Sequence, residues 1–357
     1  MRIRTGNKSG VILIIVLWVL VILTVLSLSL GRGSNIELAM AKYAIGKARS
    51  KYIAWAGLFY SVYQLKQDTK DPASAAEDNL YYCGIKTDDS VNPETLFKDH
   101  KVEGGEFSIY YRQEASDSGR KRIVYGLFDE ERLLNLNGIN SFNVPILESL
   151  LTVLGVEQEK ARTIAAAVAD WQDGDDNLSD GEYGAENDYY SSLPKPYLCK
   201  NSAFNSLPEL LLVKGMDKEA YSLVKNYLTV LPSQGGLKVN FNTASYPVLL
   251  ALAMDSLKRT VNATEEDARS LVEKMIKYRR GGDQTEFTSD DRKVDLTETP
   301  VNAVERNIFL QMSRYKTDRS QYFRVHSQGT DSARKIKTNL TAVIDRDDNS
   351  VLYWKIN

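Results

Sequence analysis

The densest group of side chains that could bind a ligand is an acidic run between residues 170 and 190. It contains no lysine or arginine, and its eight carboxylates are Asp170, Asp173, Asp175, Asp176, Asp180, Glu182, Glu186 and Asp188. Like charges at this density repel one another unless water solvates them or a cation gathers them. Calcium binds about six to eight oxygen ligands on a flexible loop, whereas magnesium uses fewer protein ligands. The run therefore predicts a calcium site or, as the alternative, a solvated acidic loop.

Catalytic chemistry has no comparable pattern in this sequence. His100 and His326 lie outside any H-x-x-x-H or H-E spacing, and no G-x-S-x-G motif occurs. The acidic run is polar and interrupted by glycine, so it lacks the apolar pocket that raises the pKa of a catalytic carboxylic acid. We therefore expect a protein that is not an enzyme and has no small-molecule substrate.

An apolar segment near the N-terminus is long enough to cross a membrane. Val11 to Leu30 carry no charge, and a helix of this length spans roughly 30 Å, the thickness of a bilayer core. The segment ends without the small-residue pattern of a secretory cleavage site. Arg2, Arg4 and Lys8 precede it, which favours a cytoplasmic N-terminus. We expect a single span with the body of the chain outside the cytoplasm.

The two cysteines, Cys83 and Cys199, leave two interpretations open. In an oxidising compartment of the periplasmic kind, a disulfide between them is chemically allowed. Two free, buried thiols are the alternative.

The spacing of apolar residues predicts that the helix continues beyond the membrane segment to about Lys66. Its apolar stripe, which we expect to pack on a sheet, consists of Ile45, Ala48, Tyr52, Trp55, Leu58, Phe59 and Val62. Alternating residues at 106–113 and 120–130, separated by SDSG, predict a hairpin. Strand patterns return only at 321–328, 333–345 and 350–356. The chain is thus expected to form an antiparallel sheet on a stalk helix.

The segment between these strands, residues 131–315, has helical spacing throughout. It holds a weak internal repeat, in which LNLNGINSFNVPILESLL and VNFNTASYPVLLALA both place N-x-N before an apolar helix. The polar residues at these positions are predicted to cap helix N-termini: Asn137, Asn140, Asn242 and Thr243. We therefore predict an all-helical insertion that projects from the sheet.

Two further segments, TVLGVEQEKARTIAAAV and LLVKGMDKEAYSLVKNYL, are similar to helix-hairpin-helix modules, which clasp DNA phosphates. A membrane-tethered DNA-binding protein of the DNA-uptake type is therefore the alternative function. Phosphate binding requires a basic surface, but residues 128–231 contain 17 Asp and Glu against 8 Lys and Arg. We expect the hairpins to serve as packing units and expect no nucleic-acid partner.

Several motifs in a fixed order resemble the K-type minor pseudopilins of the bacterial type II secretion system. They cover nearly the whole chain: Gly10 before the apolar run, DEERLLNLNGIN (129–140), VADWQDGDD (168–176), YGAEND (183–188), LVKGM (212–216) and VNFNTAS (239–245). The resemblance implies a pilin-like α+β fold with a large inserted all-α domain, here built from helix-hairpin-helix-like repeats. The implied parts are a leader at 1–10, a transmembrane helix at 11–30, pilin-like portions at 31–130 and 316–357, and the inserted domain at 131–315.

The resemblance also implies a function. Prepilin peptidase cuts after Gly10, so that Val11 becomes the methylated N-terminus of an inner-membrane subunit with a periplasmic body. The subunit assembles with the I-type and J-type minor pseudopilins at the pseudopilus tip. Relatives carry calcium in the inserted domain, and the matching positions here are Asp170, Asp173, Asp175, Asp176, Glu186 and Asp188.

The fifth residue after the expected cut is Ile15. Ordinary pilins have glutamate there, and an acidic residue at the bilayer centre costs on the order of 3 kcal/mol unless it is paired. The glutamate pairs with the N-terminal amine of the preceding subunit. A tip subunit has no preceding subunit, so isoleucine favours a role in priming the filament.

Overall fold

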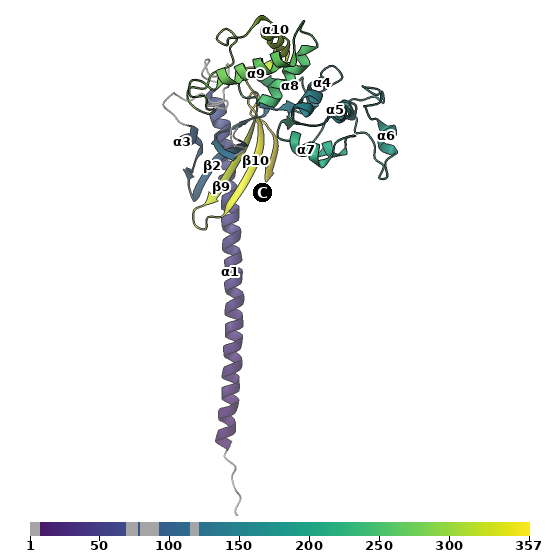
Figure 1. Cartoon of the computed structure of the whole chain (residues 1–357). Helices are drawn as coiled ribbons and strands as arrows, with labels where there is room; N and C mark the ends of the chain where they lie inside the picture. Colours follow the sequence, from purple (N-terminus) through teal and green to yellow (C-terminus); the bar gives the residue numbers. More distant parts are fainter. Residues whose placement is uncertain (1–7, 69–77, 79–92, 115–120) are drawn as a thin grey trace, which may run out of the picture.

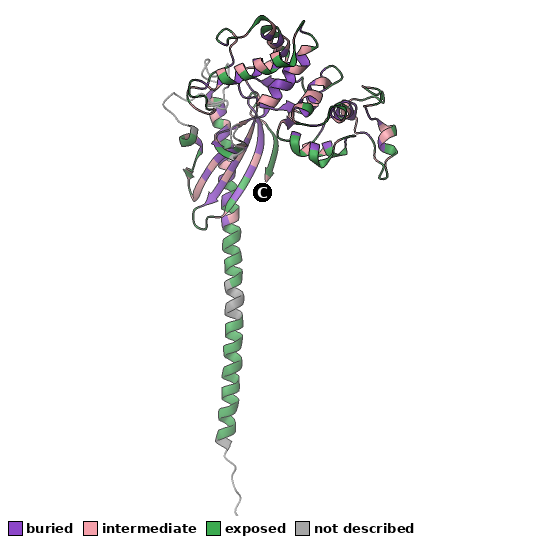
Figure 2. Ribbon diagram, viewed as in Figure 1, coloured by how far each residue is buried: buried purple, intermediate pink, exposed green. Residues whose placement is uncertain are grey.

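The computed structural model of the chain describes residues 8–68, 78, 93–114 and 121–357 (Figure 1). A single helix, α1, runs from Lys8 to Asp68 and has 61 residues, which corresponds to roughly 90 Å. The candidate membrane span Gly10–Ser29 and residues 36–45 are exposed, and this part of α1 projects from the rest of the molecule (Figure 2). Its second half packs on the sheet. The prediction of a helix continuing to about Lys66 is confirmed.

The sheet is antiparallel and has seven strands. Its main order is β1-β2-β9-β10-β11, while β3 pairs with β2 and β4 pairs with β9. The strands are β1 (His100–Val102), β2 (Gly105–Glu114), β3 (Lys121–Tyr125), β4 (Phe128–Asp129), β9 (Tyr322–Asp331), β10 (Lys337–Asp345) and β11 (Val351–Ile356). A short helix, α3 (Pro93–Phe97), precedes β1. The predicted hairpin and the three predicted C-terminal strands are all present.

The chain between β4 and β9 is mainly helical and lies beyond one end of the sheet (Figure 1). Its helices are α4 (Val144–Val153), α5 (Gln158–Gln172), α6 (Asn187–Ser191), α7 (Lys218–Val224), α8 (Tyr246–Leu257), α9 (Glu265–Arg279) and α10 (Ala303–Met312). Its 3-10 turns are η1 (Glu130–Arg132), η2 (Leu136–Gly138), η3 (Leu207–Leu212) and η4 (Ser313–Tyr315). Four two-residue strands also occur, and they form the parallel pairs β5 (Leu134–Asn135) with β6 (Leu228–Thr229) and β7 (Val239–Asn240) with β8 (Lys316–Thr317). The spacing of apolar residues did not predict these strands.

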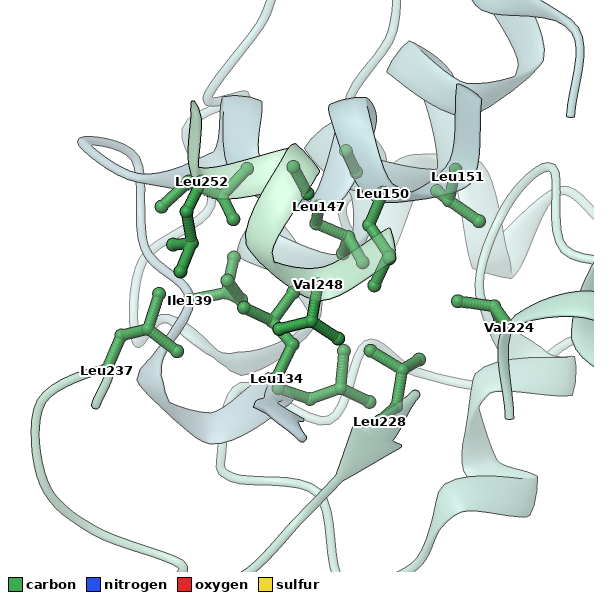
Figure 3. Packing of buried hydrophobic residues seen from close by; sticks show 14 of the residues in the cluster. Leu134, Ile139, Leu147, Leu150, Leu151, Val224, Leu228, Leu237, Val248 and Leu252 are labelled. Carbon is green, nitrogen blue, oxygen red and sulfur yellow. The ribbon is translucent and has the colours of Figure 1, made fainter. Parts of the chain in front are cut away.

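The helical part has a core of its own, formed where α4 and α8 pack together. Leu147 and Leu150 of α4 meet Val248 and Leu252 of α8, and Leu134 packs beside them (Figure 3). A second core lies between α1 and the sheet. Each side chain of this size contributes roughly 1.5–3 kcal/mol on burial, so the helical part and the sheet are each stabilised by their own apolar contacts.

The face of α1 that contacts the sheet is only partly the predicted one. Leu58 is buried there, and Trp55 and Val62 pack against the same core. Ile45, Tyr52 and Phe59 point to solvent and are 57%, 72% and 65% exposed. The buried face instead carries a row of small residues at helical spacing, together with Ile53, Leu58 and Leu65: Gly46, Ser50, Ala54, Gly57 and Ser61. The reason is close approach, because a Cβ added to Gly57 would lie 2.1 Å from Oγ of Ser327 in β9.

The predicted helix caps are also wrong, because these polar residues join distant segments instead. Asn137 donates from Nδ2 to the carbonyls of Phe204 and Val230, at 3.0 and 2.7 Å. Asn140 closes a local turn by accepting a hydrogen bond from the backbone N–H of Phe142. The partly buried amide of Asn137, which satisfies several backbone groups at once, contributes more to the fold than an exposed cap would.

Asn242 and Thr243 form the corresponding contacts in the second half of the repeat. Oδ1 of Asn242 accepts a hydrogen bond from the N–H of Val294 at 2.8 Å. The hydroxyl of Thr243 donates to Asp129, which also accepts a hydrogen bond from Nδ2 of Asn240. Burial raises the pKa of Asp129 to about 6, although its hydrogen bond with Thr243 opposes that shift. This buried cluster ties the helical part to β4 and hence to the sheet.

Candidate metal centre

Three acidic residues of the run 170–190 converge between α5 and α6. Asp170 lies in the last turn of α5, Asp173 follows its end, and Glu186 immediately precedes α6. The alanines at 165–167 are buried and small, which lets α5 pack closely against α4 and turns Asp170 inward. The chain then loops back over Asp170 at Gly184, where a Cβ would lie 2.2 Å from Oδ2 of Asp170.

The three side chains form a compact acidic triad. One carboxylate oxygen from each of Asp170, Asp173 and Glu186 lies within 4.8 Å of the other two. Asp170 is fully buried, and its oxygens accept hydrogen bonds from the N–H groups of Ser179 and Ala185 at 2.9 and 2.7 Å. The loop backbone therefore holds this carboxylate in place.

The other two members have fewer partners than Asp170. Among the described residues, Oδ1 of Asp173 and both carboxylate oxygens of Glu186 are buried and accept no hydrogen bond from nitrogen or oxygen. Burial, together with the negative charges of Asp170 and Asp173, raises the pKa of Glu186 to about 7. Burial likewise raises the pKa of Asp173, as do Asp175 and Asp170.

These observations fit a cation. A buried carboxylate without a partner is costly, and an ion bound among the three would satisfy the oxygens and offset their mutual repulsion. Oxygen-only ligation is characteristic of a hard divalent cation. The buried triad of Asp170, Asp173 and Glu186 can therefore hold a metal ion.

The other three predicted ligands are not brought into the triad. Asp175 accepts hydrogen bonds from the backbone and the side chain of Asn177. Asp176 accepts one from Nδ2 of Asn187 at 2.9 Å, and Asp188 is exposed in the first turn of α6.

The rest of the loop is held from outside the triad. Asp180 forms an ion pair with Arg162 at 2.7 Å, and Nζ of Lys214 donates to the carbonyls of Glu182 and Gly184. Arg162 and Lys214 thus hold the acidic loop in place, and the spacing of the acidic run did not predict their contacts with it.

Cys199 lies beside the triad. It is buried and has no disulfide partner among the described residues, and its Sγ lies 3.6 Å from the carbonyl oxygen of Asp170. Burial raises the pKa of its thiol to about 11. Nothing in the sequence spacing placed it there. Cys83 lies outside the described residues, so the Cys83–Cys199 disulfide stays a prediction.

Gly10, Val11 and Ile15 lie on the projecting part of α1. A Cβ on Gly10 would meet nothing within 4 Å, and Val11 and Ile15 are 60% and 57% exposed. These residues contact no other element among the described residues, as expected of a segment that a bilayer or neighbouring helices would cover.

Comparison with known proteins connects this architecture to secretion. A family model described as type II secretion system (T2SS), protein K, matches residues 128–233. Type II secretion system protein K of Pectobacterium carotovorum is 30% identical over 175 residues, which cover 48% of this chain and 49% of the relative. The protein of the same name from Pseudomonas aeruginosa is 26% identical over 246 residues, 69% of this chain and 68% of the relative. The match thus spans about half the length of the first relative.

One solved structure shares the fold over most of the chain. It is a chain of the crystal structure of the GspK-GspI-GspJ complex from the type 2 secretion system of enterotoxigenic Escherichia coli, with a TM-score of 0.63 and 17% identity. The alignment covers 89% of this chain and 99% of that chain. The chain combines an N-terminal helix, whose second half packs on an antiparallel sheet, with a helical part before the last strands. Over residues 128–233 the chain is therefore similar to type II secretion system protein K, and over most of its length it shares the fold of a chain of the GspK-GspI-GspJ complex.

Proposed function

We propose that this chain is a minor pseudopilin at the tip of the periplasmic pseudopilus, which it primes for protein export across the outer membrane. The observation that carries the proposal is the continuity of α1, which runs from an exposed apolar segment into the core of the sheet domain without a break. One helix can therefore anchor the subunit in the inner membrane before assembly and lie in the filament afterwards.

An exposed apolar row on α1 supports helix packing in a filament. Leu38, Ile45, Tyr52 and Phe59 recur every seven residues and are all at least 50% exposed. A seven-residue repeat of apolar side chains is the pattern by which helices pack along one another. Ile45, Tyr52 and Phe59, which the sequence assigned to the sheet, are thus proposed to face another pseudopilin together with Leu38.

The membrane end of α1 supports processing and priming. Gly10 precedes the apolar span and is accessible, so we place the prepilin peptidase cut after it, with Val11 as the new N-terminus. Ile15 then occupies the position where an extending subunit needs an acid. We infer an N-terminus in the cytoplasm and a body in the periplasm from the basic residues before the span.

The solved complex supports the identity of the partners. That structure contains GspK together with GspI and GspJ, and we propose that this chain assembles with the corresponding I-type and J-type subunits. We place pilin-like portions at 31–130 and 316–357 and the inserted domain at 131–315. Within it, helix-hairpin-helix-like repeats would serve as packing units, and the DNA-uptake alternative has no support from the family match.

We also propose that the ion of the acidic triad is calcium. The loop supplies carboxylates and carbonyls on a glycine-interrupted backbone, which suits calcium's large and flexible coordination shell better than magnesium's rigid one. In this proposal Asp170, Asp173 and Glu186 are the core ligands. Asp175, Asp176 and Asp188 would join only if the loop moves toward the ion.

Purification of the full chain from membranes tests this function. Co-expressed with prepilin peptidase and tagged I-type and J-type subunits in calcium, the chain should co-purify with both. Its intact mass should correspond to a methylated N-terminus at Val11. If Cys83 and Cys199 form a disulfide, alkylation without reductant should leave the mass unchanged. Alkylation after reduction should raise the mass by two alkyl groups. A chain that purifies alone, together with normal secretion after deletion of its gene, would contradict the proposal.

Substitution of Ile15 by glutamate tests the priming role. An unpaired acid in the bilayer costs on the order of 3 kcal/mol, and the tip subunit has no preceding amine to offset that cost. We expect fewer pseudopili per cell in Ile15→Glu, counted by electron microscopy, and a normal number in the control Ile15→Leu. Equal numbers of pseudopili in both variants would show that Ile15 does not contribute to priming.

A further inference from the structure

A large cleft lies between the sheet and the helical part, away from the acidic triad. Its volume is about 1290 Å³, above the roughly 300–1,000 Å³ of pockets for small molecules. Arg324, His326 and Gln328 of β9 line its floor, and α9 and the start of α8 line the opposite wall. Neighbouring residues of β9, Phe323 and Val325, belong to the core under α1. Because side chains alternate along a strand, the cleft is on the face of the sheet opposite α1.

The cleft is basic although the whole chain has a net charge of -2. Seven lysine and arginine side chains line it, against the two carboxylates of Glu273 and Glu286. Three of the cations, Arg112, Lys225 and Lys277, are exposed and form no ion pair among the described residues. They come from β2, the end of α7 and α9, so they surround the opening.

The other four cations are held inside by the fold. Arg279 is 1% exposed and donates to the carbonyls of Phe241 and Ala244 at 3.0 and 2.7 Å, while its Nε has no partner. Arg324 forms an ion pair with the buried Glu130.

Glu286 is shared between two of these cations. Its Oε1 lies 3.4 Å from Nη2 of Arg279 and 3.6 Å from Nε of Arg280. The remaining cation, Arg132, donates to the amide oxygen of Gln113 at 3.2 Å. The positive charge of the cleft therefore exceeds the negative charge available to neutralise it.

The uncharged lining suits a polypeptide. Gln328 donates to the hydroxyl of Tyr110 at 3.1 Å and to Oδ1 of Asn339 at 2.9 Å, so amide and phenol groups are arrayed along the floor. Amides both donate and accept hydrogen bonds, which matches a peptide backbone. Tyr246 and Phe128 add aromatic surface of the kind enriched where proteins bind one another.

We propose that this cleft binds an extended acidic polypeptide segment of a protein outside the pseudopilus. That the segment comes from outside the pseudopilus rests on the proposed function. In that function the exposed apolar row of α1 is covered by other pseudopilins, whereas the opposite face of the sheet stays open. Nucleic acid is disfavoured, since the whole chain has a net charge of -2 and residues 128–231 are acidic overall.

Fluorescence anisotropy on the full chain in detergent tests the proposal. The probe is a labelled ten-residue peptide of alternating glutamate and tyrosine, compared with a glutamine and tyrosine peptide of the same length. We expect binding of the acidic peptide only, weakening as salt is raised. The double variant Lys225→Glu, Lys277→Glu should weaken binding at least tenfold.

The control is Lys218→Glu, Arg269→Glu, which reverses the same number of charges on exposed residues of the same two helices, α7 and α9, outside the cleft. It should change the affinity less than twofold. Equal binding of the two peptides, an equal loss in the control, or competition by duplex DNA but not by unlabelled acidic peptide would overturn the proposal. Loss of peptide binding when the I-type and J-type subunits are added would show that the cleft is covered within the pseudopilus, and it would contradict a segment from outside. Failure to assemble with those subunits contradicts the proposed function instead, and the double variant should assemble normally.

Discussion

Gly329→Ala should destabilise the folded chain strongly although it adds a single methyl group. A Cβ on Gly329, in β9, would lie 2.3 Å from the carbonyl oxygen of Ser50 and 2.4 Å from the backbone nitrogen of Ala54. Both atoms belong to the backbone of α1, which cannot rotate away as a side chain would. Relieving the clash requires the helix to move off the sheet and to open the core that includes Ile53 and Leu58.

We expect a loss of about 3 kcal/mol, at the upper end of the cost of overpacking and a large part of a typical stability of roughly 5–15 kcal/mol. Urea unfolding of the detergent-solubilised chain, followed by tryptophan fluorescence, measures it. The matched control is Gly236→Ala, because a Cβ there meets nothing within 4 Å and the backbone does not have a positive φ. Its stability should be unchanged or slightly higher. Similar midpoints for the two variants would show that α1 does not approach β9 this closely.

Calcium should raise the melting temperature of the full chain relative to chelator, and Glu186→Gln should abolish that rise. Binding to the folded state adds RT ln(1 + [L]/Kd), about 2.7 kcal/mol at a hundredfold excess over Kd. Without metal the same substitution should stabilise the chain above pH 7. The reason is that Glu186, whose pKa is raised to about 7, is then a buried anion in the folded state, a cost that glutamine avoids.

The two effects have opposite signs, so the order of the two melting temperatures should reverse. Above pH 7, Glu186→Gln should melt at a higher temperature than wild type in chelator and at a lower temperature than wild type in calcium. Differential scanning calorimetry in both conditions measures this. Glu182→Gln is the control, since Glu182 is exposed in the same run and outside the triad. Asp188→Asn tests whether a predicted ligand outside the triad contributes. Identical melting temperatures in calcium and in chelator would contradict the site.

The two faces of α1 show where sequence reasoning reached its limit. The large apolar stripe and the row of small residues both have helical periodicity, and hydrophobicity alone favours the stripe. The sheet selects the row of small residues because β9 approaches α1 closely, with Gly329 against the backbone of Ser50 and Ala54. Asn137 and Asn242 were assigned to helix caps for a related reason. A local motif suggests a local partner, but their partners lie 52 to 93 positions away.

The sequence by itself determined the properties that depend on neighbouring residues. These are the membrane-length helix, the alternating strands, the helical segment between them and the acidic run from Asp170 to Asp188. Only the tertiary structure decided which carboxylates converge, that Cys199 lies beside them, which face of α1 is buried and that Arg112, Lys225 and Lys277 surround one cleft. The physical reason is that periodicity and charge density act within a few turns of chain. Burial and close approach depend instead on residues that are distant in sequence and meet only when the helices pack against the sheet.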